Sequence, residues 1–163
     1  MTRMPPAEAK ADTLARFADQ GPGHINCAQA VVRFAMLVQG YDPDLIDHAR
    51  YLGGGIAGMG EVCGAVSGSA LSLGISAHQR ATAEQADPPA PPPPEEPPMP
   101  DRIQALMREF TEQFGALRCR DLTGFDLSSP ETRDAFHQSD VSRRCADYVG
   151  WACDRLAPLL PDA

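Results

Sequence analysis

Apolar side chains recur three or four residues apart along most of this chain, which is the spacing of one face of a helix. No stretch alternates convincingly between apolar and polar residues, as a half-buried strand would. The pattern predicts helices over residues 7–20, 27–40, 42–52, 61–76, 101–115, 131–138 and 141–156. We therefore expect an all-α protein, a compact multi-helix bundle built on one core.

The clearest helix start lies at Asn26, just before an apolar run. Asn26 and Gln29 have the form of a capping box. In a capping box the first side chain accepts a hydrogen bond from a free backbone N–H, and the second reaches back to satisfy another. With Asn26 as the cap, Cys27 occupies the first position of the helix.

A glycine-rich turn over residues 53–60 leads into a segment of small residues that contains Cys63. Gly60, Gly64 and Gly68 recur every four residues there, a spacing that lets a neighbouring helix approach closely. Glycine also adopts backbone conformations that are strained for other residues. We expect these three glycines to let the backbone approach a bound group beside Cys63.

Proline dominates residues 88–100, which cannot form regular helix or sheet and are expected to run as an exposed, semi-rigid polyproline linker. We interpret residues 79–100 as a proline-rich insertion in a single helical domain spanning residues 1–163. A docking site for a proline-recognition module is the alternative interpretation of this segment.

Composition narrows the classes of function. The net charge of −8 argues against nucleic-acid binding, which needs a concentrated basic surface. The least charged window, residues 53–77, holds too much Gly and Ser for a convincing membrane span, and the first residues contain no apolar signal segment. We therefore expect a cytoplasmic protein, in which five cysteines are mostly reduced and more often bind metal or do redox work.

Four of the cysteines fall at predicted helix ends. Cys27 and Cys63 are each expected in the first turn of a helix, where free N–H groups and the helix dipole lower a thiol pKa. Cys119 has Arg118 and Arg120 beside it, and those cations would offset a thiolate charge. Cys145 lies near the start of the last helix.

The spacings between these cysteines match no zinc finger, no C-x-x-C redox motif and no local ferredoxin run. From the residues alone, three interpretations stay open: buried inert cysteines, a metal or cluster site, and a dithiol couple.

Several linked motifs nevertheless resemble one family. They are Asn-Cys-Ala-Gln-Ala-Val at 26–31, Gly-Glu-Val-Cys-Gly-Ala-Val-Ser-Gly at 60–68, Cys-Arg-Asp-Leu at 119–122, and Cys145. Together they resemble the C_GCAxxG_C_C family, described as redox-active proteins. The resemblance runs from about residue 11 to residue 159, interrupted by the proline-rich segment.

The resemblance implies an all-helical fold and makes Cys27, Cys63, Cys119 and Cys145 the characteristic set, called the four-cysteine group below. The family is similar in part to the split-Soret cytochromes, which carry a cysteine-bound non-haem iron centre besides haem. This chain has no C-x-x-C-H motif, so covalent haem does not carry over. Cys153 lies outside the family pattern and is expected to be structural.

These observations lead to one main hypothesis. The four-cysteine group binds an iron–sulfur cluster of unknown nuclearity, and the protein exchanges electrons with an unknown redox partner. The first alternative is a metal-free thiol–disulfide oxidoreductase in which Cys63 attacks and Cys27 or Cys119 resolves. The second is a non-redox helical module, with structural zinc or with the proline-rich segment recruiting a partner. A homodimer is compatible with the small-residue helix faces.

Overall fold

A computed structural model describes residues 2–19, 21–87 and 96–160 of the protein. Within these residues the chain is all-α, as the sequence predicted, and the only strand-like pairing is an isolated bridge between Val62 and Arg118. The elements in chain order are α1 (Pro6–Ala18), α2 (Cys27–Gln39), the 3₁₀ helix η1 (Pro43–Ala49), α3 (Gly64–Ala86), α4 (Met99–Phe114), α5 (Cys119–Thr123), α6 (Pro130–Gln138), α7 (Val141–Leu156) and the 3₁₀ turn η2 (Ala157–Leu159).

Local signals account for the ends of α2. The Asn26 side chain accepts hydrogen bonds from the N–H groups of Ala28 and Gln29, and Gln29 accepts one from the N–H of Asn26. The predicted capping box is therefore confirmed. Gly40 ends the helix in the left-handed conformation, with φ of 69°, which costs glycine no side-chain clash.

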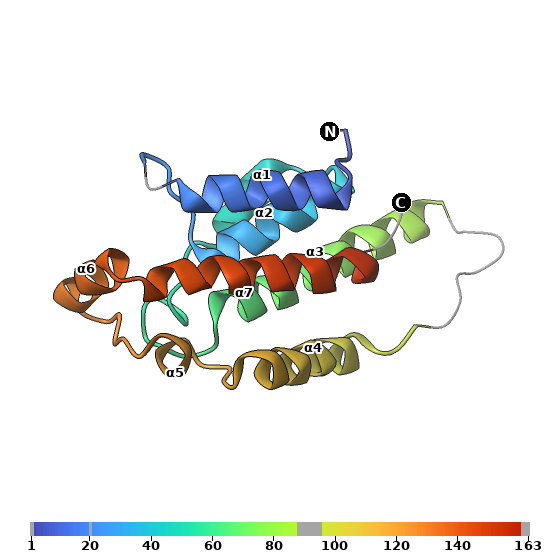
Figure 1. Ribbon diagram of the computed structural model, residues 1–163. Coiled ribbons are helices and arrows are strands. Elements are labelled where there is room, and N and C mark those ends of the chain that lie inside the picture. Colours follow the sequence, from blue (N-terminus) through green and yellow to red (C-terminus); the bar gives the residue numbers. More distant parts are fainter. Residues whose placement is uncertain (1, 20, 88–95, 161–163) are drawn as a thin grey trace.

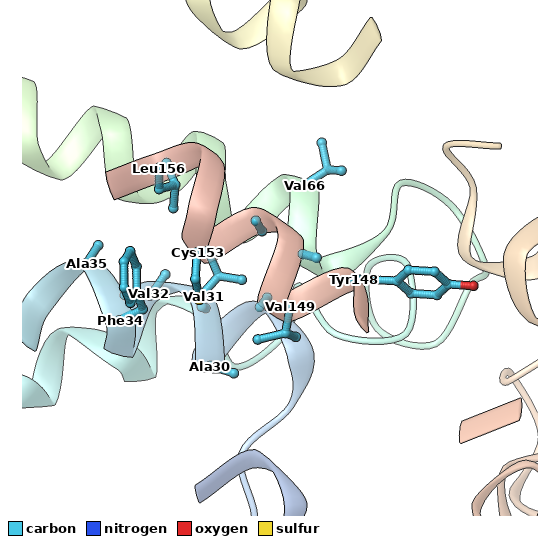
Figure 2. Close-up of a cluster of buried hydrophobic side chains, with 14 of the residues drawn as sticks. Ala30, Val31, Val32, Phe34, Ala35, Val66, Tyr148, Val149, Cys153 and Leu156 are labelled. Atoms are coloured by element: carbon cyan, nitrogen blue, oxygen red, sulfur yellow. The ribbon is translucent and has the colours of Figure 1, made fainter. Parts of the chain in front are cut away.

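The helices surround α2 and α7. Figure 1 shows α1 and α2 on one side of α7 and α4 on the other, with α5 and α6 near the beginning of α7. The core between α2 and α7 consists mainly of aliphatic side chains (Figure 2), including Val31, Val32, Val149 and Leu156, each fully buried. The apolar helix faces that the sequence pattern predicted are thus removed from water. Their burial is the main contribution to the stability of the fold.

An aromatic cluster joins α4 to α7. Phe110 and Phe114 of α4 lie against Tyr148 and Trp151 of α7, with ring centroids between 4.8 and 6.0 Å apart. The rings meet edge to face, which is a favourable arrangement for aromatic pairs. The helix that follows the proline-rich segment is thus packed on the same core as the helices before it.

The boundaries of α3 differ most from the prediction. The helix begins at Gly64 instead of residue 61, and it continues to Ala86 instead of ending near residue 76. Residues 77–86 are mostly exposed and rich in alanine, which favours helix without forming an apolar face. The first residues of the expected insertion, 79–86, are therefore helical.

The prolines at the start of α4 also differ from the prediction, because the helix begins at Met99 with Pro100 in its first turn. Proline is tolerated there since the first N–H groups of a helix have no partner within it. Glu96, just before α4, pairs with Arg80 of α3 at 3.1 Å and with Arg102 of α4 at 2.8 Å. The polyproline linker was predicted over residues 88–100. Residues 88–95 lie outside the described residues, residues 96–98 are exposed and non-helical, and the prediction is wrong for residues 99 and 100, which are helical.

The described part of the chain contains no helix with the length and apolarity that a membrane crossing requires.

The predicted short helix after residue 42 is present, but as the 3₁₀ helix η1. The short helix α5 was not predicted as a helix at all.

Candidate functional site

Cys27 is the first residue of α2, where the capping box places it. Burial raises the pKa of Cys27, while hydrogen bonds from the backbone N–H groups of Gly54, Ala28 and Gly64 lower it in part. Two of these donors come from the first turns of helices, and the third comes from the glycine-rich turn. Three segments of the chain therefore direct backbone donors at one sulfur.

The glycine-rich turn has an unusual conformation. Residues 54–58 all have positive φ, including Ile56 at 61° and Ala57 at 51°. A β-branched residue is rarely found there, and each non-glycine residue in this region costs about 1–2 kcal/mol. Such strain persists only where the surroundings fix the conformation, and it is concentrated at functional sites. The left-handed turn holds the N–H of Gly54 toward Cys27.

Cys63 is buried and occupies the N-cap position of α3, just before Gly64, instead of the predicted first turn; its side chain makes no capping hydrogen bond. Its N–H donates to the carbonyl of Leu117 at 2.9 Å, and the N–H of Cys119 donates to the carbonyl of Glu61 at 2.7 Å. These two hydrogen bonds, together with the Val62–Arg118 bridge, join the segments that carry Cys63 and Cys119. Residues 56 positions apart in sequence are thereby fixed side by side.

The remaining thiols of the group complete the site. Cys119 is the first residue of α5 and is buried, whereas Cys145 lies half-buried in the second turn of α7. Burial raises the pKa of Cys119 to about 11, with a further contribution from the charge of Cys27 and an opposing hydrogen bond from Thr123. Burial raises the pKa of Cys145 as well, again with contributions from Cys27 and Cys119.

The four-cysteine group thus comes from four separate segments of the chain, and its thiols interact electrostatically. Burial raises the pKa of Cys63 well above its ordinary value, and Cys27, Cys119 and Cys145 each add to the shift. The charge of Cys27 raises the pKa of all three other thiols, while three backbone donors point at Cys27 itself. We expect Cys27 to be the first of the group to lose its proton.

The predicted lowering of the pKa of Cys27 and Cys63 is wrong for the metal-free protein. Helix-start N–H groups do reach both sulfurs, since Ala65 donates toward Cys63. Desolvation outweighs them, because a thiolate removed from water among other thiols loses more than a few N–H donors return. This balance depends on tertiary burial, which the position of a cysteine in its helix does not reveal.

The arginines beside Cys119 have a different role from the predicted one. Arg118 pairs with Glu61 at 3.1 Å, and Arg120 lies 3.8 Å from the same carboxylate and donates to the carbonyl of Met59. Neither contributes to the pKa shift of Cys119. Both arginines hold the end of the glycine-rich turn against α5.

The three singled-out glycines differ in what surrounds them. A Cβ on Gly64 would overlap the sulfur of Cys27, and one on Gly68 would lie 2.7 Å from the carbonyl oxygen of Ala28 in α2. Gly60 has φ of 73° and lies under the side chain of Arg120. Close packing by Gly64 and Gly68 is thus present, and Gly64 directly borders a thiol of the group.

Sequence reasoning missed two contributors to this site. The sequence did not show which glycine of the turn would donate its N–H to Cys27. The many glycines before Cys63 did indicate that backbone approaches a thiol there. Thr123, four residues after Cys119 and so on the same side of α5, carried no signal of its own.

Cys153 is separate from the four-cysteine group. It is fully buried in the main core, and burial raises its pKa to about 12, with Lys10 and Asp154 as its charged neighbours. All five cysteines are free thiols. Among the described residues, no group of three or more His, Cys, Asp or Glu side chains could hold a metal ion in this conformation.

Comparison with known proteins gives one result. The model of a family described as "Putative redox-active protein (C_GCAxxG_C_C)" matches residues 25–159, a span that includes every member of the four-cysteine group. No curated protein matches the chain, and no solved structure matches it.

Proposed function

The chain belongs to the C_GCAxxG_C_C family of redox-active proteins, and on that premise we propose that it is an electron-transfer protein carrying an iron–sulfur cluster. The residues that would hold the cluster are Cys27, Cys63, Cys119 and Cys145. When bound, the cluster would supply the capacity to accept and release single electrons. The chain would position it and exchange those electrons with a partner protein.

The observation that carries this proposal is the mutual electrostatic interaction of the four thiols. Four thiolates, two buried and two half-buried, cannot coexist there without a compensating positive charge, because each would repel the others in a poorly solvated site. Iron supplies that charge, and thiolate is the form that ligates iron–sulfur clusters. The composition of the site therefore fits such a cluster, although the thiols must move together to bind it.

The backbone around Cys27 adds support. Hydrogen bonds from N–H groups to ligand sulfurs shift the potential of a cluster, and Cys27 already receives such bonds from Gly54, Ala28 and Gly64. The missing side chain at Gly64 lets the sulfur of Cys27 approach that backbone. In the proposal these groups fix the orientation of one ligand, while Gly60 and Gly68 let neighbouring backbone approach.

Anaerobic reconstitution with iron and sulfide tests the proposal. The wild-type protein should bind both elements and gain a broad visible absorption band, and Cys63→Ser should lose most of that band. A protein that stays colourless and free of iron after reconstitution would refute it. One zinc per chain without iron would instead select a structural zinc module.

A metal-free dithiol enzyme is the second candidate, favoured by the contact between the Cys27 sulfur and Gly64, the neighbour of Cys63. Two thiols would form one disulfide, passing two electrons and two protons to a substrate disulfide. Here Cys27 is better placed than Cys63 to attack, because its thiolate receives the backbone hydrogen bonds. Mass spectrometry after diamide treatment would show a defined, reversible Cys27–Cys63 disulfide if this candidate is correct.

A further inference from the structure

A pocket without cysteines lies beside the N-terminal cap of α2. A pocket of about 360 Å³ opens between α1, the loop before α2, the first turns of α2, and η1. The described residues that line it are Arg16, Gly23, His24, Ile25, Gln29, Arg33, Ile46, Asp47 and Arg50. No cysteine is among these lining residues.

The charge in this pocket contrasts with that of the chain. Three arginines line it, from α1, α2 and the end of η1, against the single carboxylate of Asp47. The protein as a whole has 22 acidic and 14 basic residues. Asp12 and Asp19, which lie outside the lining, pair with Arg33 and Arg16, so the local charges balance. The pocket nevertheless gathers three guanidinium groups on an acidic protein, and guanidinium groups favour an anion.

The arginines are oriented by single carboxylates and keep donor capacity. Arg33 directs both Nε and Nη2 at one oxygen of Asp12, and Arg50 binds Asp47 through Nη2 at 3.1 Å. Arg16 binds Asp19 through Nη1 at 3.1 Å and the carbonyl of Gly23 through Nη2. Since each guanidinium has five N–H donors, these contacts orient the groups without exhausting them.

The pocket is also more than a phosphate-sized depression. Its volume lies within the range of small-molecule sites, and Ile25 and Ile46 give it apolar wall beside the arginines. Planar guanidinium groups pair with carboxylate and phosphate oxygens in two-pronged hydrogen bonds. We propose that this arginine pocket binds a small organic dianion, either a phosphate monoester or a dicarboxylate, through Arg16, Arg33 and Arg50.

The pocket adjoins the cap of the helix that begins with Cys27. Asn26, which caps α2, donates from its side chain to the carbonyl of Arg50 at 2.8 Å. Gln29 both completes the capping box and lines the pocket. A ligand bound here would lie against the elements that position Cys27, yet its binding does not depend on any metal at the thiols.

Calorimetric titration of the full-length, metal-free protein at low salt tests the proposal, with glycerol 3-phosphate and succinate as separate probes. At least one probe should bind with a dissociation constant at or below about 1 mM. Arg50→Gln should weaken that binding about tenfold, as loss of a charge-assisted hydrogen bond does. The matched control is Arg108→Gln, which removes the same charge from an exposed position of α4 outside the pocket and should leave affinity unchanged.

A variant that binds the probe more tightly than the wild type cannot be explained by loss of structure. Asp47→Asn removes the carboxylate that competes with the ligand for Arg50, so it should strengthen binding severalfold. Which probe binds decides between a phosphate monoester and a dicarboxylate. The proposal is overturned if neither probe binds, or if Arg50→Gln and Arg108→Gln have equal effects.

Discussion

Helix α7 carries two cysteines, eight residues apart, in very different surroundings. Cys145 near its beginning interacts electrostatically with Cys27 and Cys119, at the end of the molecule where α5 and α6 lie (Figure 1). Cys153, two turns further along, is fully buried among aliphatic side chains (Figure 2). The beginning of α7 thus belongs to the four-cysteine group, while the rest of the helix packs into the hydrophobic core.

The difference shows which signal identifies a thiol site. Burial is the largest cause of the raised pKa at both cysteines, so a raised pKa alone does not distinguish them. What distinguishes Cys145 is that other thiols add to its shift. The convergence of cysteines from separate elements, more than their burial, makes the beginning of α7 the candidate site.

The largest expected effect is the loss of iron binding when Cys145, but not Cys153, is replaced. Cys145→Ala should abolish iron binding after reconstitution, because it removes a ligand. Cys153→Ala should retain full iron binding and cost about 1 kcal/mol of unfolding free energy, the order expected for losing a small buried group. Iron analysis and urea unfolding measure the two effects. Equal iron content in both variants would contradict the distinction between the two ends of α7.

The close approach of α2 and α3 can be broken at one glycine. Gly68→Ala should lower the free energy of unfolding by about 1–3 kcal/mol, because the added Cβ would lie 2.7 Å from the backbone of Ala28. Gly74→Ala on the same helix is the control. Nothing lies within 4 Å of its Cβ position, so alanine should stabilise the helix by about 0.5–1 kcal/mol. Urea unfolding that gives both changes the same sign would refute this packing.

Alkaline pH should destabilise the folded protein through its buried thiols. The pKa of Cys119 rises from 9.0 to about 11 on folding, so the folded state holds its proton more tightly than the unfolded state. Stability is therefore complete below the unfolded pKa, falls as pH rises from 9.0 toward 11, and falls no further from this group above that.

The measurement is urea unfolding of the reduced, metal-free protein between about pH 8 and pH 11. Cys119 should contribute a fall on the order of 1–2 kcal/mol. Cys119→Ala should remove that part of the fall and leave the contributions of the other buried thiols. An identical pH profile in the variant would show that Cys119 is not buried as described.

The smallest effect is expected at the surface of the glycine-rich turn. Glu61→Gln removes the ion pair with Arg118, which is about half exposed, so it should cost only about 0.2–1 kcal/mol. Glu112→Gln is the control, because Glu112 is exposed on α4 and has no ion pair among the described residues. Thermal unfolding at low and high salt should show that the difference shrinks as salt screens the pair. A difference that persists at high salt would mean that Glu61 acts through more than charge.

Much of the helical architecture was predictable because its signals are local. The capping box at Asn26 and the apolar spacing that defines α2 and α7 each lie within a few residues of what they determine. The extension of α3 to Ala86 was missed because its last turns are exposed and form no apolar face. The short helix α5 was missed because five residues carry too little pattern.

The sequence by itself determined the all-α fold, the start of α2 at Cys27 and the family to which the chain belongs. Only the tertiary structure decided that the four thiols converge, that their pKa values rise, and that three arginines surround one pocket. The physical reason is that desolvation and charge interactions depend on distances between segments far apart in the chain. Helix caps and apolar periodicity depend on neighbours in sequence, so they can be predicted without the tertiary structure.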